Sequence, residues 1–67
     1  MTIILNGQTT KDYPAPLRVS ELIALLPLNK VPVIVELNGI ALRPIEHETS
    51  IVQEGAIVEI VRIAAGG

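Results

Sequence analysis

The 67-residue sequence contains no cysteine, no phenylalanine and no tryptophan, and Tyr13 is its single aromatic residue. The lack of cysteine excludes a disulfide framework, a thiolate metal site and an iron–sulfur cluster. No apolar run approaches the roughly 18 to 20 residues that span a bilayer, and no signal-peptide pattern is present, so we expect a cytoplasmic protein without membrane association. A net charge of −2, no basic cluster and no aromatics for base stacking argue against nucleic acid as a partner.

What the sequence has instead is aliphatic residues. Hydrophobic residues make up 49% of the chain, almost all of them Ile, Val, Leu and Ala, and the mean hydropathy is +0.53. A chain this short buries only about 60% of its unfolded surface, so its core has to be dense in such side chains. We expect one domain over residues 1–63, followed by a flexible Ala-Ala-Gly-Gly tail over residues 64–67.

Two Asn-Gly pairs, Asn6-Gly7 and Asn38-Gly39, each lie between apolar segments. Asn-Gly is the strongest short-range hairpin signal, because a type I′ turn needs positive φ at both central residues. The sequence therefore predicts two tight hairpins. Their strands would be residues 2–5 with 8–12, and residues 31–37 with 40–42.

One helix is predicted over Val19–Leu26. Its apolar residues recur at helical spacing and line a single face, while Ser20 and Glu21 suit the first turn and Pro27 ends the helix. Two turns are not stable alone, so this helix must lie on a sheet. The apolar residues are Val19, Leu22, Ile23 and Leu26.

The remaining segments complete a mixed sheet. Pro14 and Pro16 predict an extended connector, Arg43–Gln53 an irregular polar loop, and Ile57–Ile63 the last strand. The order hairpin, helix, hairpin, loop and strand predicts an α+β fold. We expect a mixed four- to five-stranded sheet packed on one short helix, with the last strand parallel to the first.

Alternation along the strands divides the sheet residues between two faces. Seven aliphatic residues would point toward the helix: Ile3, Leu5, Val33, Val35, Leu37, Val58 and Ile60. Ile4, Ile34 and Val61 would point the other way, together with Glu36 and Glu59. Apolar clusters rimmed by polar residues often mark partner surfaces, so we expect this second face to bind a protein partner. Arg62, just before the tail, is a further candidate contact.

The chain ends in Ala64-Ala65-Gly66-Gly67. Glycine loses more freedom on ordering than any other residue, so this ending contributes little to stability. It suits a slender tether for the terminal carboxylate. Fully extended, four residues reach about 13 Å, enough to thread a narrow tunnel into the active site of another protein.

Taken together, these features resemble the ThiS family, the small sulfur carriers of thiamine thiazole synthesis. The resemblance covers the whole chain, and its motifs are Asn6-Gly7, the helix at 19–26, the segment 33–39, Gly55 before the last strand, and Ala65-Gly66-Gly67. It implies a β-grasp (ubiquitin-like) fold. Members commonly have an aspartate after the glycine of the last turn, where this chain has Ala56.

The resemblance also implies a chemical cycle on the carboxylate of Gly67. A ThiF-type enzyme would adenylate it using ATP and Mg²⁺, and a sulfur donor (a desulfurase or sulfurtransferase) would convert the adenylate to a thiocarboxylate. The thiocarboxylate would then deliver sulfur to a ThiG-type thiazole synthase. The chain itself would bind no cofactor and would be a protein co-substrate rather than an enzyme.

Three other functions stay open at this point. They are a carrier like the small subunit of molybdopterin synthase, a ubiquitin-like protein modifier, and a β-grasp interaction domain of the TGS type. A metal site at Glu46-His47-Glu48 is not expected, because adjacent loop side chains rarely converge on one ion and no second His or Cys exists.

Overall fold

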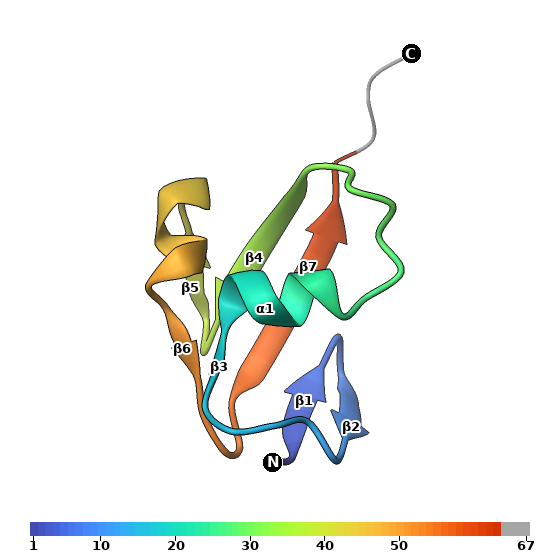
Figure 1. Cartoon of the computed structure of the whole chain (residues 1–67), viewed down its shortest axis with the longest axis vertical. Helices are drawn as coiled ribbons and strands as arrows, with labels where there is room; N and C mark the ends of the chain where they lie inside the picture. The colour runs from blue at the N-terminus through green and yellow to red at the C-terminus, as the bar shows by residue number, and fades with distance from the viewer. Residues whose placement is uncertain (64–67) are drawn as a thin grey trace.

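The computed structural model describes residues 1–63, which form a five-stranded mixed sheet crossed on one face by a short helix (Figure 1). The order of the sheet is β2-β1-β7-β4-β5, and a separate two-stranded sheet pairs β3 with β6. The elements are β1 (Ile3–Leu5), β2 (Gln8–Thr10), β3 (Leu17–Arg18), α1 (Val19–Ala24), β4 (Val33–Leu37), β5 (Ile40–Leu42), the 3₁₀ helix η1 (Pro44–Glu48), β6 (Ile51–Val52) and β7 (Ile57–Arg62). The predictions for residues 64–67 lie outside the described part of the chain.

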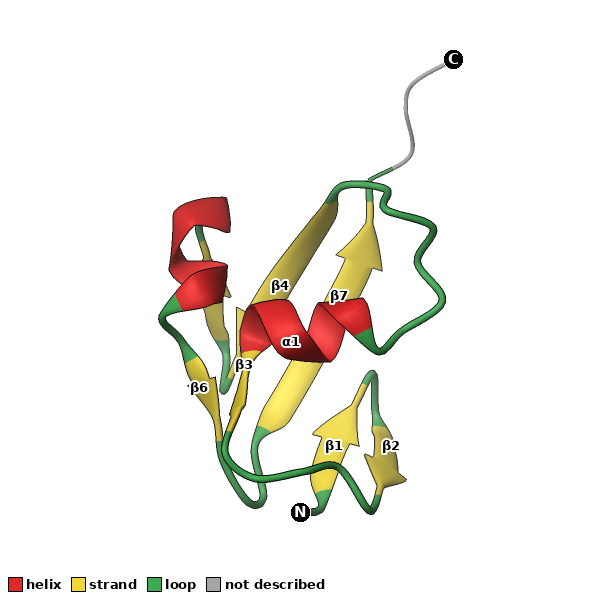
Figure 2. Cartoon of the chain, viewed as in Figure 1, coloured by secondary structure: helices red, strands yellow, loops and turns green. Residues whose placement is uncertain are grey.

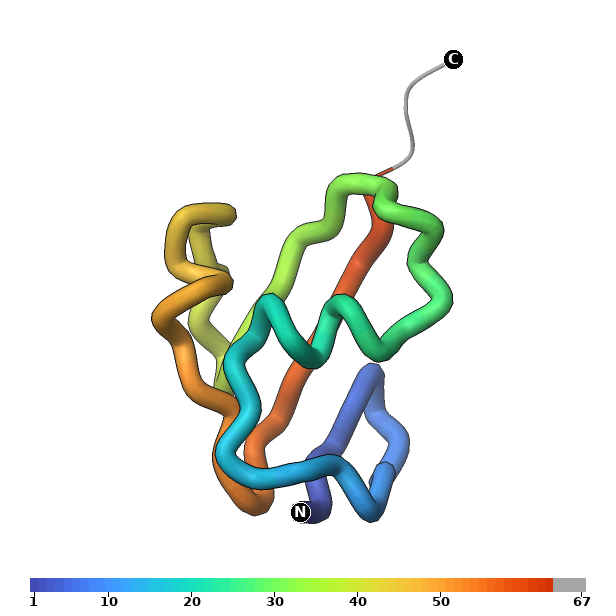
Figure 3. Tube along the Cα trace, viewed as in Figure 1, coloured from blue at the N-terminus to red at the C-terminus, as the bar shows by residue number. Residues whose placement is uncertain are grey.

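The last strand, β7, occupies the centre of the sheet. It runs parallel to β1 and antiparallel to β4, so the predicted parallel pairing of the last strand with the first is confirmed. The chain returns from α1 through residues 25–32 to the start of β4, beside the end of β7 (Figure 3). There the Ile63 N–H donates a hydrogen bond to the Pro32 carbonyl at 2.9 Å.

Both predicted Asn-Gly hairpins are present. Asn6 and Gly7 have φ of 49° and 80°, and Asn38 and Gly39 have φ of 51° and 83°. Both turns thus have the two left-handed residues that a type I′ turn requires. They fix the registers β1–β2 and β4–β5, and with them the face on which each side chain lies.

The core lies between the sheet and α1. Of the seven residues expected to face the helix, Ile3, Val35, Val58 and Ile60 are buried, and the other three are partly buried and pack against them. Tyr13, the single aromatic residue, also packs against this core. Among residues 1–63, the buried residues are Ile3, Leu17, Val19, Leu22, Val35, Val52, Ala56, Val58 and Ile60.

Five predicted elements are shorter in the structure (Figure 2). The helix ends at Ala24 instead of Leu26, and the last strand ends at Arg62 instead of Ile63. The strands predicted over residues 2–5, 8–12 and 31–37 span residues 3–5, 8–10 and 33–37. The predicted irregular loop 43–53 contains η1 and β6, and the predicted connector is followed by β3, which pairs with β6 through Leu17 and Val52. Strands of two residues show no alternation, and burial of these two side chains is what holds them together.

Both helices begin with the pattern Arg-x-x-Glu. The Arg18 N–H donates to the Glu21 carboxylate at 2.8 Å, and the Arg43 N–H donates to the Glu46 carboxylate at 2.6 Å. Each glutamate thereby satisfies a backbone donor that a helix start leaves unpaired.

None of the helices within residues 1–63 has the length and apolar character needed to cross a membrane.

Candidate partner-binding face of the sheet

The face of the sheet opposite α1 carries a cluster of exposed aliphatic side chains. In Figure 1 the helix crosses one side of β4 and β7, and alternation points every second residue of these strands to the other side. Cross-strand neighbours on that side are Ile34 with Val61, Glu36 with Glu59, and Ile4 with Ile57. We call these six residues the open face.

Exposure sets the open face apart from the helix side. Ile4 is 36% exposed, Ile34 49%, Ile57 48% and Val61 57%, whereas Val35 and Val58 between them are fully buried. The structure thus brings together the five sheet residues expected on this face. It adds Ile57, which sequence reasoning missed although it shares the alternation of Glu59 and Val61.

The two carboxylates of the open face are direct cross-strand neighbours. A backbone hydrogen bond joins a directly opposed pair at each end of the β4–β7 ladder. The Asn38 N–H donates to the Ile57 carbonyl at one end, and the Ile63 N–H donates to the Pro32 carbonyl at the other. Because hydrogen-bonded and non-bonded pairs alternate in antiparallel sheets, Glu36 and Glu59 form a hydrogen-bonded pair, with Cα atoms about 5.5 Å apart. Their like charges repel each other across the strands.

No cation within residues 1–63 neutralises this pair. In that part of the chain the one ion pair joins Arg43 Nε and Glu46 Oε1 at 3.5 Å, and neither residue belongs to the open face. Arg62 is exposed, but it pairs with Val33 and alternation assigns it to the helix side of β7. The open face is therefore apolar with an unneutralised acidic pair.

Glu46 and His47 of η1 interact with residues close to them in the fold. The Arg43 backbone N–H, and less strongly the Arg43 guanidinium and His47, hold the pKa of Glu46 below its ordinary value against a smaller opposing effect of desolvation. His47 lines a small apolar hollow of about 250 Å³ with Ile23 and Pro44. Its Nε2 is buried and has no hydrogen-bond partner among residues 1–63. Across residues 1–63, no three His, Cys, Asp or Glu side chains gather as metal ligands.

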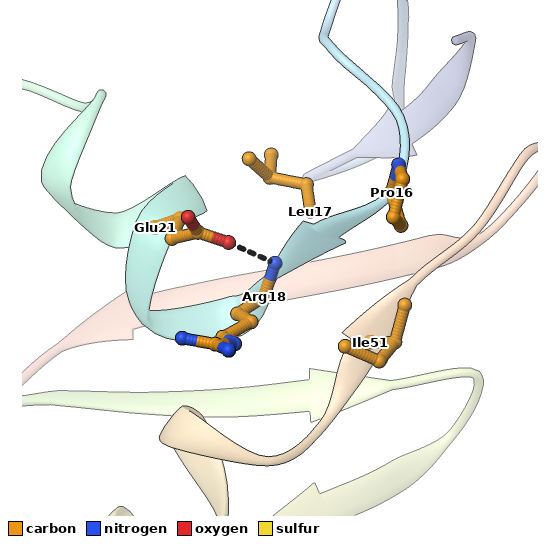
Figure 4. Close-up of a pocket in the computed structure, with 5 residues that line it drawn as sticks. All are labelled: Pro16, Leu17, Arg18, Glu21 and Ile51. Atoms are coloured by element: carbon orange, nitrogen blue, oxygen red, sulfur yellow. Dashed lines mark hydrogen bonds between the residues drawn. The ribbon is translucent and has the colours of Figure 1, made fainter.

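A second hollow, of about 300 Å³, lies beside the start of α1 (Figure 4). Its lining includes Arg18 and Glu21, but the Glu21 carboxylate accepts the Arg18 N–H that the dashed line marks. The polar groups drawn there therefore serve the helix start, and the hollow offers no paired acid and base.

Two asparagines position β7, a role that sequence reasoning missed. Asn6 Oδ1 accepts from the Ile60 N–H at 2.8 Å, and Asn6 Nδ2 donates to the Ile60 carbonyl at 3.3 Å. Asn38 Oδ1 accepts from the Ile57 N–H at 2.9 Å. The turn residues of both hairpins thus hold the strand that leads to the C-terminal residues. The sequence shows only their turn chemistry, because these contacts depend on tertiary pairing.

A mixed five-stranded sheet with one crossing helix and the last strand at its centre defines a β-grasp domain. The model of the ThiS family matches residues 3–67, and the chain belongs to that family. The predicted family and fold are confirmed. The candidate tail residues Ala64, Ala65, Gly66 and Gly67 fall within the match but outside the described structure.

Two solved structures from Geobacter metallireducens are similar to the chain. A crystal structure of the thiamine biosynthesis protein ThiS is 33% identical, with a TM-score of 0.83 and complete coverage of both chains. A solution NMR structure of a thiamine biosynthesis protein is 31% identical, with a TM-score of 0.76, and covers 100% of this chain and 88% of its own. The comparison with curated proteins found no match. Family membership supports a sulfur carrier in thiamine biosynthesis that works with enzymes of that pathway.

Proposed function

We propose that the chain carries sulfur as a thiocarboxylate on Gly67 and delivers it to the thiazole of thiamine. The observation that carries the proposal is the family match, which extends through Gly66 and Gly67 on a fold whose central strand leads to them. The partners are a ThiF-type adenylyltransferase, a sulfur donor and a ThiG-type thiazole synthase. The chain acts as their co-substrate.

The chemistry starts from a poor electrophile. The Gly67 carboxylate attacks the α-phosphorus of ATP and displaces pyrophosphate, which yields an acyl adenylate. The terminal sulfur of a persulfide on the donor then attacks the acyl carbon and AMP leaves, which gives an acyl disulfide. A thiol of a partner protein attacks the donor-side sulfur of that disulfide, so the thiocarboxylate is released and a disulfide is left on the partner side. ATP and Mg²⁺ are held by the activating enzyme, so the carrier supplies the reacting carboxyl group and its position.

Positioning depends on the anchored end of β7. The residues after Ile63 span at most about 13 Å, so the active site of each partner has to lie within that reach of the sheet. Gly66 and Gly67 lack side chains, which lets two different enzymes close around the reacting carbon. Ala64 and Ala65 add little width to the same segment.

The open face supplies the docking surface in this proposal. Ile4, Ile34, Ile57 and Val61 expose apolar area beside the strand that leads to the tail. Burying that area against a partner stabilises the complex by about 25 cal/mol per Å² before the costs of association. When a partner binds this face, the rigid sheet fixes the point at which the tail starts and the direction in which it leaves the domain.

The test is the intact mass after incubation with the ThiF-type enzyme, ATP, Mg²⁺ and a sulfur source. We expect a gain equal to the exchange of one oxygen for sulfur, located on the C-terminal peptide. The variant that lacks Gly67 should keep the melting temperature of the wild type and support no ATP–pyrophosphate exchange. An unchanged mass of the wild-type chain, with the enzyme shown active on another carrier, would refute the proposal.

A further inference from the structure

The acidic pair of the open face identifies the chemistry of the partner surface. We propose that Glu36 and Glu59 together bind one cationic side chain on the activating enzyme, set within an apolar docking surface. This inference rests on the proposed function and adds the feature of the enzyme that recognises the carrier.

The geometry of the pair suits a shared cation. Glu36 and Glu59 are direct neighbours on β4 and β7, both are exposed, and both belong to the same face. On the far side of Glu36, β5 contributes Ala41, whose methyl group leaves the carboxylates open from that direction. Toward the tail, the next pair on this face is Ile34 with Val61. A cation placed over the pair therefore contacts two carboxylates and is bordered by aliphatic side chains.

The pair lacks an internal partner within residues 1–63. The five cationic side chains of the sequence are Lys11, Arg18, Lys30, Arg43 and Arg62, and none of them occupies a strand position on the open face. The free carrier therefore retains the repulsion between the two carboxylates. A cation from outside removes this repulsion and adds two attractions at once.

The apolar surroundings increase the effect of the cation. Exposed charge pairs in water contribute little, because water and salt screen them. When Ile34, Val61 and Ile57 are covered by the partner, water is excluded around the carboxylates and the same charges interact more strongly. The pair thus adds charge complementarity to a face whose area alone does not select among partners.

Removal of the charges should therefore act in opposite directions on folding and on binding. In the variant Glu36→Gln/Glu59→Gln the cross-strand repulsion is lost, so the melting temperature should rise by about 2–5 °C. Its affinity for the enzyme should fall about tenfold or more, through slower association and faster dissociation, and the salt dependence of association should weaken. A purely solvated pair predicts the rise in stability without the loss of affinity.

The experiment measures thermal unfolding, association rate and affinity for the ThiF-type enzyme at low and high salt. Glu48→Gln/Glu54→Gln is the matched control, because it removes two charges at exposed positions of η1 and the turn before β7, outside the open face. We expect the control to bind like the wild type. Because Glu54 accepts the Thr2 N–H, the single variant Glu48→Gln is compared with Glu59→Gln in parallel.

Charge inversion provides a second, independent comparison. Glu36→Lys creates an attractive cross-strand pair, so the fold should be at least as stable as the wild type while association becomes slower than in the glutamine variants. Equal affinity of the wild type, Glu36→Gln/Glu59→Gln and Glu36→Lys would overturn the inference.

Adenylation of the wild type, followed in the same samples, separates this result from a failure of the proposed function. If the wild type is adenylated and the charge variants bind normally, the cationic contact alone is wrong. If the wild type is not adenylated, the proposed function is refuted, and the inference that rests on it is refuted as well.

Discussion

Replacement of Asn6 tests whether its side chain anchors the strand that leads to the tail. Asn6 and Asn38 each precede a glycine in the same kind of turn, with φ of 49° and 51°. They differ in their tertiary contacts, because the Asn6 side chain exchanges two hydrogen bonds with Ile60 and that of Asn38 accepts one from Ile57. The two positions therefore form a matched pair within one protein.

The expected losses follow from these contacts. Each hydrogen bond contributes about 1 kcal/mol net, so Asn6→Gly should destabilise the fold by about 2 kcal/mol and Asn38→Gly by about 1 kcal/mol. Glycine adopts positive φ freely, which keeps the turn itself intact. Alanine adds a strain of about 1 kcal/mol in the left-handed region, which brings the two losses to about 3 and 2 kcal/mol.

Urea denaturation and thermal unfolding of the four variants measure these differences. For a domain of this size, 1 kcal/mol corresponds to about 4–8 °C in melting temperature, so the two glycine variants should be clearly separated. The step from glycine to alanine should be the same at both positions, since the backbone conformations match. Equal losses for Asn6→Gly and Asn38→Gly would show that the contacts with Ile60 contribute nothing beyond the turn.

Other changes have equally defined outcomes. Val58→Ala removes two methyl groups from a fully buried position and should lower the free energy of unfolding by about 2 kcal/mol, measured in urea. Lys30 has φ of 60°, so Lys30→Gly should stabilise the fold by about 0.5–1 kcal/mol despite the added freedom of the unfolded chain, and a lower melting temperature would contradict this. Because the folded-state pKa of Glu46 is lowered, its contribution to stability is present above the ordinary carboxyl pKa of about 4.3 and is lost as the pH falls through the lower folded value. Glu46→Gln should therefore unfold with a weaker acid dependence than the wild type, and an identical acid profile would refute that assignment.

Much of the sheet could be predicted because its turns are local. Two Asn-Gly turns set the registers of both hairpins, and alternation then assigned Ile4, Ile34 and Val61 to the face away from the helix. The same reasoning would have placed Ile57 there, since it lies two residues before Glu59. All six residues of the open face could therefore have been predicted from the sequence.

Contacts between distant segments could not be predicted in this way. Strands β3 and β6 have two residues each, too few for a periodic pattern, and they exist because Leu17 and Val52 are buried together. The bonds from Asn6 to Ile60 join residues 54 positions apart. Their formation depends on where β7 lies after the whole chain has folded.

The central position of β7 has a mechanical consequence. Any force applied through the residues that follow β7 would act along this strand, which is paired with β1 on one side and β4 on the other. Force in that direction loads the ladder bonds of both neighbours in shear, so many must break together, whereas a strand at the edge of a sheet can be peeled away one bond at a time. Forced unfolding then depends on a slow, cooperative unfolding step. A carrier built in this way can be held by its end and pulled without losing its shape.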